Sequence, residues 1–147
     1  MYDDPLTRAL DLVGDRWSFL VIRELGLGAD RFETLLERTG APRAVLSGRL
    51  RDLREAGLVS AQDYQEPRRR TRQRYVLSPA GRALRPVLAA LSTWAEDHTP
   101  SGRPSATVER HRGCGGVVRT VQVCDCGAIT TDVLTELVPI ELTEGAA

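Results

Sequence analysis

The sequence predicts a mainly α-helical domain with a small two-stranded sheet, followed by a small β-rich appendage. Three observations predict this fold class. Apolar residues recur at helical spacing through residues 1–98, two short β-prone runs interrupt that pattern, and residues 107–147 are rich in β-branched residues and glycine. Residues 99–106, rich in proline, glycine and serine, are expected to form a linker between the two parts.

Size and composition favour one domain with an appendage. The chain has 147 residues, of which 41% are hydrophobic, and this is enough to bury the core of one domain. It contains no run of eighteen apolar residues, and its first residues lack the pattern of a signal peptide, so we expect a cytoplasmic protein without membrane association. Three cysteines, all between positions 114 and 126, suggest a reducing compartment rather than a disulfide framework.

The first two helices are predicted from residues that can cap them. Asp4 precedes a proline, a pairing typical of a helix N-terminus, and this helix should end near Gly14. Asp15 is expected to cap a second helix that runs through Leu25. Because the second helix is apolar on more than one side, we expect it to be enclosed by the others.

A third and a fourth helix follow. Asp30 with Glu33 resembles a capping box, which predicts a short third helix that ends before Gly40. Residues 42–56 then predict a fourth helix, with one apolar stripe formed by Leu46, Leu50 and Leu53.

The next segment predicts a basic hairpin and a last helix. Residues 58–63 and 74–77 are strand candidates. Residues 64–73 lie between them, and together with Arg74 they form an arginine-rich wing, residues 64–74. Ser78 and the proline after it predict the start of a long apolar helix to about His98. Pro86 lies inside this helix and should bend it.

Charge is distributed unevenly along a chain whose formal net charge is zero. Residues 1–37 hold four arginines and eight acidic residues, a charge of −4, and residues 86–147 have the same balance. Residues 38–85 hold twelve arginines and four acidic residues, a charge of +8. A basic central module of this kind suits nucleic acid, although an arginine run alone could also be a solvated surface.

The candidate DNA contacts lie on the fourth helix and the hairpin. The side of that helix opposite the leucine stripe carries small residues and arginines, which would allow close approach to the major groove: Arg43, Ala44, Ser47, Gly48, Arg51 and Arg54. The hairpin supplies five arginines for the DNA backbone or the minor groove: Arg68, Arg69, Arg70, Arg72 and Arg74.

Five segments in order resemble the HxlR-type winged helix-turn-helix transcriptional regulators, a branch near the MarR family. They are RALDLVGDRWSFLVIREL (8–25), RFETLL (31–36), VLSGRLRDLREAGLV (45–59), RYVLSPAGRAL (74–84) and Trp94 in LSTWAEDH. The resemblance covers about residues 4–98. It implies a bacterial homodimer on a pseudopalindromic DNA operator, with the first and last helices forming most of the dimer interface.

The long apolar stripe of the last helix also favours a twofold dimer, because it exceeds what a small helical core needs. The expected interface residues are Leu6, Leu10, Val13, Leu84, Val87, Leu88 and Leu91.

One position departs from the family pattern. Many members carry a cysteine directly before the proline that opens the first helix, and it is the switch in redox-sensing members; here Asp4 takes that place and is interpreted as a cap.

Two further sets of residues have alternative interpretations. Trp17, Val21, Leu91 and Trp94 belong either to the core or interface, or to a pocket for an unknown small-molecule effector between the second and last helices. In the appendage, His111, Cys114, Cys124 and Cys126 are three thiols and one imidazole, the right number of ligands for structural zinc. The spacing between Cys124 and Cys126 is one residue shorter than in the usual zinc knuckle, so buried thiols and a redox switch stay as alternatives.

The predicted function is therefore a sequence-specific DNA-binding transcriptional regulator, modulated by a small molecule. The alternative is a thiol- or metal-responsive sensor that uses the appendage. An enzyme is not expected, because the chain has only two histidines and contains neither a nucleophile motif nor a glycine-rich phosphate loop.

Overall fold

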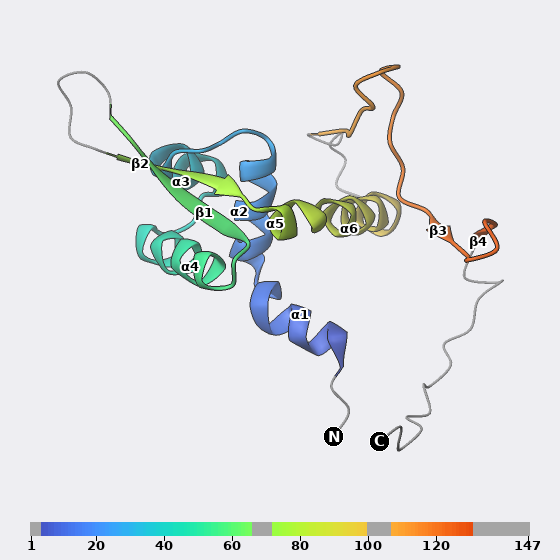
Figure 1. Ribbon diagram of the computed structural model, residues 1–147, viewed down its shortest axis with the longest axis horizontal. Coiled ribbons are helices and arrows are strands. Elements are labelled where there is room, and N and C mark those ends of the chain that lie inside the picture. Colours follow the sequence, from blue (N-terminus) through green and yellow to red (C-terminus); the bar gives the residue numbers. More distant parts are fainter. Residues whose placement is uncertain (1–3, 66–71, 100–106, 131–147) are drawn as a thin grey trace, which may run out of the picture. The chain divides into compact units, whose positions relative to one another are not determined.

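The computed structural model describes residues 4–65, 72–99 and 107–130. The chain divides into two compact units, residues 1–104 and residues 105–147, with the division inside the segment expected to be a linker. The elements of the first unit are α1 (Pro5–Val13), α2 (Arg16–Gly26), α3 (Phe32–Thr39), α4 (Arg43–Glu55), β1 (Val59–Tyr64), β2 (Arg72–Leu77), α5 (Pro79–Ala83) and α6 (Arg85–His98) (Figure 1). The predicted mainly helical fold with a small antiparallel sheet is confirmed.

Helix α2 lies at the centre of the first unit, as its apolar pattern predicts. It contacts α3, α4, α6 and β2, and its side chains Val21 and Ile22 are fully enclosed. The rest of the buried core comes mainly from leucines of the neighbouring elements: Leu35, Leu46, Leu50, Leu53, Leu58 and Leu77. Burial of these side chains supplies most of the driving force for folding this unit.

Two of the predicted caps are confirmed by their hydrogen bonds. The carboxylate of Asp4 accepts from the backbone N–H groups of Leu6 and Thr7 at the start of α1. The carboxylate of Asp15 accepts from the N–H groups of Trp17 and Ser18 at the start of α2, at 2.9 and 3.0 Å. Each cap satisfies backbone donors that have no partner within the helix.

The predicted cap of the third helix is wrong. Helix α3 begins at Phe32, and Arg31 occupies its N-cap position without a side-chain hydrogen bond. The reason lies in the sheet, because the carbonyl of Asp30 accepts the N–H of Tyr75 at 2.7 Å and Arg31 forms a β-bridge with Arg74. This pairing keeps Arg31 in an extended conformation, so α3 begins one residue later than a cap at Asp30 predicts.

The single last helix predicted from Ser78 is also wrong. The structure has two helices, α5 and α6, with a break at Leu84, whose N–H donates to the carbonyl of Gly81. Pro86 has no N–H for the carbonyl of Arg82, so the helical hydrogen-bond ladder is interrupted at this point. The predicted cap by Ser78 is confirmed, since its hydroxyl accepts the N–H of Gly81.

The hairpin of β1 and β2 is antiparallel, with Val59 opposite Leu77 and Tyr64 opposite Arg72. Both predicted strands are confirmed, but β2 begins two residues earlier than expected. Arg72 therefore lies on the same strand as Arg74 and not in the loop where it was predicted.

The second unit has little regular structure among residues 107–130. Strands β3 (Gln122–Val123) and β4 (Ile129–Thr130) pair antiparallel, and most of these residues are exposed. The β-rich run predicted from the sequence extends to residue 140, and residues 131–140 lie outside the part of the chain that the structure describes. Across both units, none of the helices that the structure describes has the length and apolar character needed to span a bilayer.

Candidate nucleic-acid interface

Helix α4 has one buried face and one face open to solvent. Leu46, Leu50 and Leu53 are at most 2% exposed and attach the helix to the core. The tight turn from α3 is made by Gly40, whose φ of 66° favours glycine, and by the buried Ala41. Of the predicted contacts on α4, Gly48 is half-buried and the remaining ones are exposed: Arg43, Ala44, Ser47, Arg51 and Arg54.

Arg43 contacts two residues of α3, and the sequence pattern did not predict either contact. Its Nη2 lies 3.0 and 2.8 Å from the two carboxylate oxygens of Glu33, and its guanidinium carbon lies 5.2 Å from the ring centroid of Phe32. Both partners of the ion pair are more than 60% exposed, so the pair is weak and exchangeable. Glu33, predicted as part of a cap, therefore orients the first arginine of α4.

Arg49 and Arg51 have different roles. Arg49, outside the predicted set, bonds Asp15 at 3.3 Å and Asp52 at 3.0 Å, and so connects α4 to the start of α2. Arg51 makes longer contacts with Asp52 and Glu55, at 3.4 and 3.9 Å, and its side chain is 70% exposed. Arg51 is thus available to a ligand on the open face, whereas Arg49 stabilises the position of the helix.

The wing, defined as β1, β2 and the segment between them, adds further cations. Arg72 and Arg74 are exposed, and Nε of Arg74 donates to the side-chain oxygen of Gln62 on β1 at 3.2 Å. Three predicted contacts lie outside the described residues: Arg68, Arg69 and Arg70.

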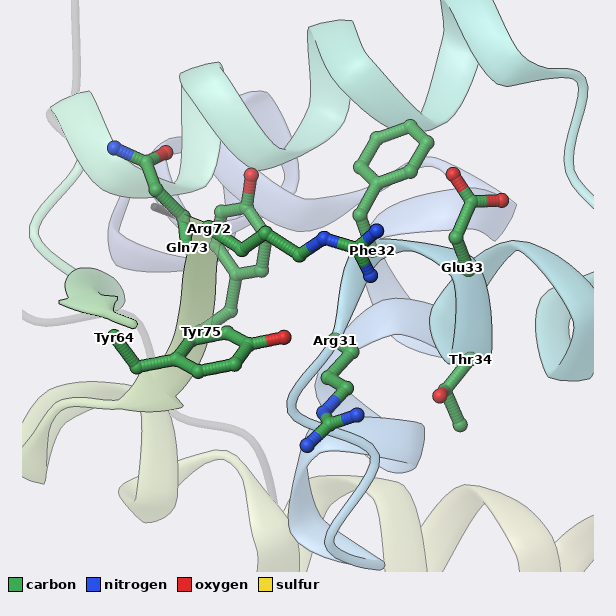
Figure 2. A pocket seen from close by; sticks show the side chains of 8 residues that line it. All are labelled: Arg31, Phe32, Glu33, Thr34, Tyr64, Arg72, Gln73 and Tyr75. Atoms are coloured by element: carbon green, nitrogen blue, oxygen red, sulfur yellow. The ribbon is translucent and has the colours of Figure 1, made fainter. Parts of the chain in front are cut away.

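A hollow of about 580 Å³ lies between the start of α3 and the ends of β1 and β2 that are farthest from the Val59–Leu77 pair (Figure 2). We refer to it as the wing hollow. Its lining residues are Arg31, Phe32, Glu33, Thr34, Tyr64, Arg72, Gln73 and Tyr75.

Comparison with known proteins identifies the family. Residues 12–103 match the HxlR-like helix-turn-helix family. The chain belongs to the HxlR-like helix-turn-helix family.

Proteins similar to this HxlR-like chain are named as transcriptional regulators or transcription factors. It is 37% identical over 125 residues to the uncharacterized HTH-type transcriptional regulator Rv3095 of Mycobacterium tuberculosis, covering 84% of this chain and 78% of that protein. It is 35% identical over 100 residues to the HTH-type transcriptional regulator sll1512 of Synechocystis, covering 65% and 73%. The crystal structure of PA1607, a proposed transcription factor, is similar along nearly the whole chain, with a TM-score of 0.80, 30% identity and coverage of 94% and 96%.

The residues predicted for the dimer interface of the HxlR-like chain fall into two groups. Val13 is only 4% exposed and belongs to the core of its own chain, so its assignment to an interface is wrong. Leu84 and Leu88 are half-buried against the same core. The remaining residues are 49–64% exposed on α1 and α6, namely Leu6, Leu10, Val87 and Leu91.

The predicted effector pocket needs a similar correction. Val21 is fully enclosed, because α2 is the central helix, and it cannot line a pocket open to a ligand. Trp17 is half-buried against the core, whereas Leu91 and Trp94 are 50% and 56% exposed. The wing hollow is lined by none of these four residues, and no sequence pattern pointed to it.

The predicted zinc ligands of the second unit are all exposed, so the alternative of buried thiols is wrong. Nδ1 of His111 lies 3.3 Å from Sγ of Cys114. Hydrogen bonds from the backbone and the side chain of Cys126 lower the pKa of the Cys124 thiol. Within the described residues, histidine, cysteine and acidic side chains do not gather in a group of three or more that could hold a metal ion.

Proposed function

We propose that this DNA-binding transcriptional regulator of the helix-turn-helix type binds a pseudopalindromic operator as a twofold homodimer. Helix α4 would enter the major groove, and the wing would contact the backbone or the minor groove. The observation that carries the proposal is the open face of α4, where exposed arginines stand on a helix whose other face is anchored in the core.

The composition of this face suits base reading. Ala44, Ser47 and Gly48 have small side chains, so the helix backbone can come close to the edges of the base pairs. Arg43 and Arg51 are exposed at 62% and 70% and long enough to donate two hydrogen bonds to one guanine. The arginines of the wing are suited to phosphates, which add affinity without reading sequence.

Exposed apolar side chains on α1 and α6 support the dimer. Leu6, Leu10, Val87, Leu91 and Trp94 are each about half exposed or more in the single chain. An interface that places the same surface of each chain against its copy would bury them around a twofold axis. Such a dimer would present its two α4 helices to half-sites about 34 Å apart, one turn of DNA.

A small-molecule effector is part of the proposal. Helices α2 and α6 are in contact, and they carry Trp17 and Trp94, whose rings would form aromatic walls of a cleft completed by the dimer. Binding there would change the geometry of the dimer and thereby the spacing of the two α4 helices.

The second candidate function is a thiol or zinc sensor in the second unit. The contact between His111 and Cys114, and the lowered pKa of Cys124, favour it. One imidazole and three thiols are a donor set that zinc accepts, but the ligands would have to move together to form a tetrahedral site. In such a sensor, metal binding would order the second unit.

DNA binding is tested by comparing two duplexes of equal length at physiological salt. One is taken from the promoter region of the protein's own gene and the other has a random sequence. We expect the promoter duplex to bind at least tenfold more tightly. Equal affinities for both duplexes would contradict the proposed function.

The roles of α4 and the wing are tested by variants. Replacing Arg69 and Arg70 by alanine should weaken binding to both duplexes and flatten the salt dependence by about one unit per lost phosphate contact. Arg51→Ala should instead reduce mainly the preference for the promoter duplex. Identical effects of the two changes on both duplexes would contradict the division of roles.

A further inference from the structure

Arg49 divides its guanidinium group between two carboxylates. Its Nη1 lies 3.3 Å from Oδ2 of Asp15 at the start of α2, and its Nη2 lies 3.0 Å from Oδ2 of Asp52, three residues further along α4. The side chains of all three residues are only 36–37% exposed. Because they are partly shielded from solvent, salt screens their attraction less than that of fully exposed pairs.

Asp52 is shared between two arginines of α4. Its Oδ2 faces Arg49 at 3.0 Å, whereas its Oδ1 faces Nη2 of Arg51 at 3.4 Å. The second distance is beyond the usual range for a hydrogen bond between nitrogen and oxygen. Since the attraction between charges falls with distance, Arg49 takes the larger part of the interaction with Asp52.

Arg51 is therefore held only loosely by its own helix. Its other partner is Glu55, whose Oε1 lies 3.9 Å from Nε of Arg51 and whose side chain is 72% exposed, so this pair is weak as well. To donate two hydrogen bonds to a guanine, the guanidinium of Arg51 has to leave both carboxylates. The cost of this step depends on how strongly Asp52 attracts Arg51.

Removal of Arg49 would change that cost. Asp15 would keep the backbone N–H groups of Trp17 and Ser18 as hydrogen-bond donors. Asp52 is in a different position, because only Arg51 would remain of the two arginines that contact it in the described part of the chain. Both oxygens and the full charge of Asp52 would then act on Arg51.

We propose that Arg49 determines the DNA sequence preference of this chain without contacting a base, because it occupies Asp52 and so leaves Arg51 available to guanine. This rests on the proposed function, in which Arg51 reads a base from the open face of α4. Arg49 lies outside the residues predicted to contact DNA, and its role is that of a positioning residue.

The test measures the promoter preference, defined as the ratio of the dissociation constants for the random and the promoter duplex, in the full chain at physiological salt. Arg49→Gln should lower this ratio by about two- to fivefold, the range expected from one exposed ion pair. Adding Asp52→Asn to Arg49→Gln should restore it, because the neutral amide no longer attracts Arg51. A role of Arg49 in anchoring α4 alone would give no such rescue, since Asp52→Asn does not replace the contact with Asp15.

Two control variants separate this effect from net charge and from anchoring. Glu37→Gln, at an exposed position of α3, gives the Arg49→Gln chain the same net charge as Asp52→Asn does and should not restore the ratio. Asp15→Asn removes the Oδ2 that contacts Arg49 but keeps the Oδ1 that accepts the capping bonds. Because Arg49 would still occupy Asp52, this variant should keep the wild-type ratio. Circular dichroism checks that every variant is folded.

A second measurement follows Arg51 in the absence of DNA. Its Nε–Hε group is assigned by the signal that disappears in Arg51→Ala, and ¹⁵N relaxation then reports its mobility on the picosecond to nanosecond timescale. Arg49→Gln should raise the order parameter of this group, because Asp52 then holds the side chain. Asp52→Asn in the same chain should return the order parameter to the wild-type value.

Four outcomes would overturn the proposal. Arg49→Gln could keep the wild-type ratio or leave the mobility of Arg51 unchanged, Asp52→Asn could fail to restore the ratio, Glu37→Gln could restore it equally well, or Asp15→Asn could lower it as much as Arg49→Gln does. The proposed function survives each of these results as long as the wild type prefers the promoter duplex and Arg51→Ala reduces that preference. Equal affinities of the wild type for both duplexes would contradict the proposed function, and this inference with it.

Discussion

Glu33 of α3 binds Arg43 of α4 through both carboxylate oxygens, across the turn of the helix-turn-helix, with distances of 3.0 and 2.8 Å. The face of Phe32 supports the same guanidinium. Because the pair is exposed, it is too weak to matter for folding, and its consequence is for DNA binding. It keeps a negative charge beside the surface that we propose meets DNA, and it orients an arginine suited to reading a base.

Glu33→Gln should therefore raise affinity for random DNA, because it removes a charge that repels phosphates. Arg43→Ala should lower the preference for the promoter duplex by about 1–3 kcal/mol, the usual value of one bidentate contact to guanine. Anisotropy titrations with both duplexes measure the two effects. Glu96→Gln, the same change in charge on α6, is the control, and an equal rise in affinity for it would refute a local role of Glu33.

The dimer should depend on the exposed apolar side chains of α6. Leu91→Asp places a charge in the middle of the proposed interface, where burying it is costly, so the variant should be a monomer at micromolar concentration. Sedimentation velocity distinguishes the two states. Leu27→Asp, which changes another half-exposed leucine at the end of α2, should remain a dimer. A wild-type monomer under these conditions would end the proposal of a twofold dimer.

Stability should decline in acid in a way that reports on the cap of α2. Partial burial raises the pKa of Asp15. Hydrogen bonds from Ser18 and Trp17, together with the charge of Arg49, lower the pKa by more than burial raises it, so it lies below the ordinary 3.8. A lowered pKa in the folded state means that the stabilisation is complete above pH 3.8 and is lost as the pH falls through the folded value. Denaturant unfolding at a series of pH values measures this.

Two substitutions separate the charge of Asp15 from its capping bond. Asp15→Asn keeps a hydrogen-bond acceptor and should stay near wild-type stability at neutral pH, with a weaker decline in acid. Asp15→Ala should lose about 1 kcal/mol at neutral pH. If both variants have the same stability at neutral pH, the capping bond contributes little.

Zinc in the second unit would appear as about one metal ion per purified chain. Cys114→Ser should then lose the metal and loosen the second unit, while the first unit unfolds as in the wild type. Metal analysis and amide hydrogen exchange measure the two consequences. A wild-type protein that contains no zinc after purification in zinc-supplied medium, with equal exchange in the variant, would exclude zinc binding by the second unit.

The sequence alone was sufficient for features that depend on neighbouring residues. The caps by Asp4 and Asp15 and the leucine stripe of α4 each involve groups within one or two helical turns, so their spacing along the chain predicts them. The strands of the wing were predicted from two short β-prone runs on either side of an arginine-rich segment. The exposed face of α4 followed from its buried one, because the two lie on opposite sides of a helix.

Only the tertiary structure decided which distant groups meet. The start of α3 is delayed because Asp30 and Arg31 pair with β2, and Val13 is buried because the packing of the helices encloses it. Glu33 contacts Arg43 across a turn, and Arg31 and Arg72 line one hollow although α3, α4 and β1 lie between them in sequence. These contacts depend on how rigid elements are packed, and residue spacing carries no information on that, because many pairings of the same elements satisfy the same local patterns.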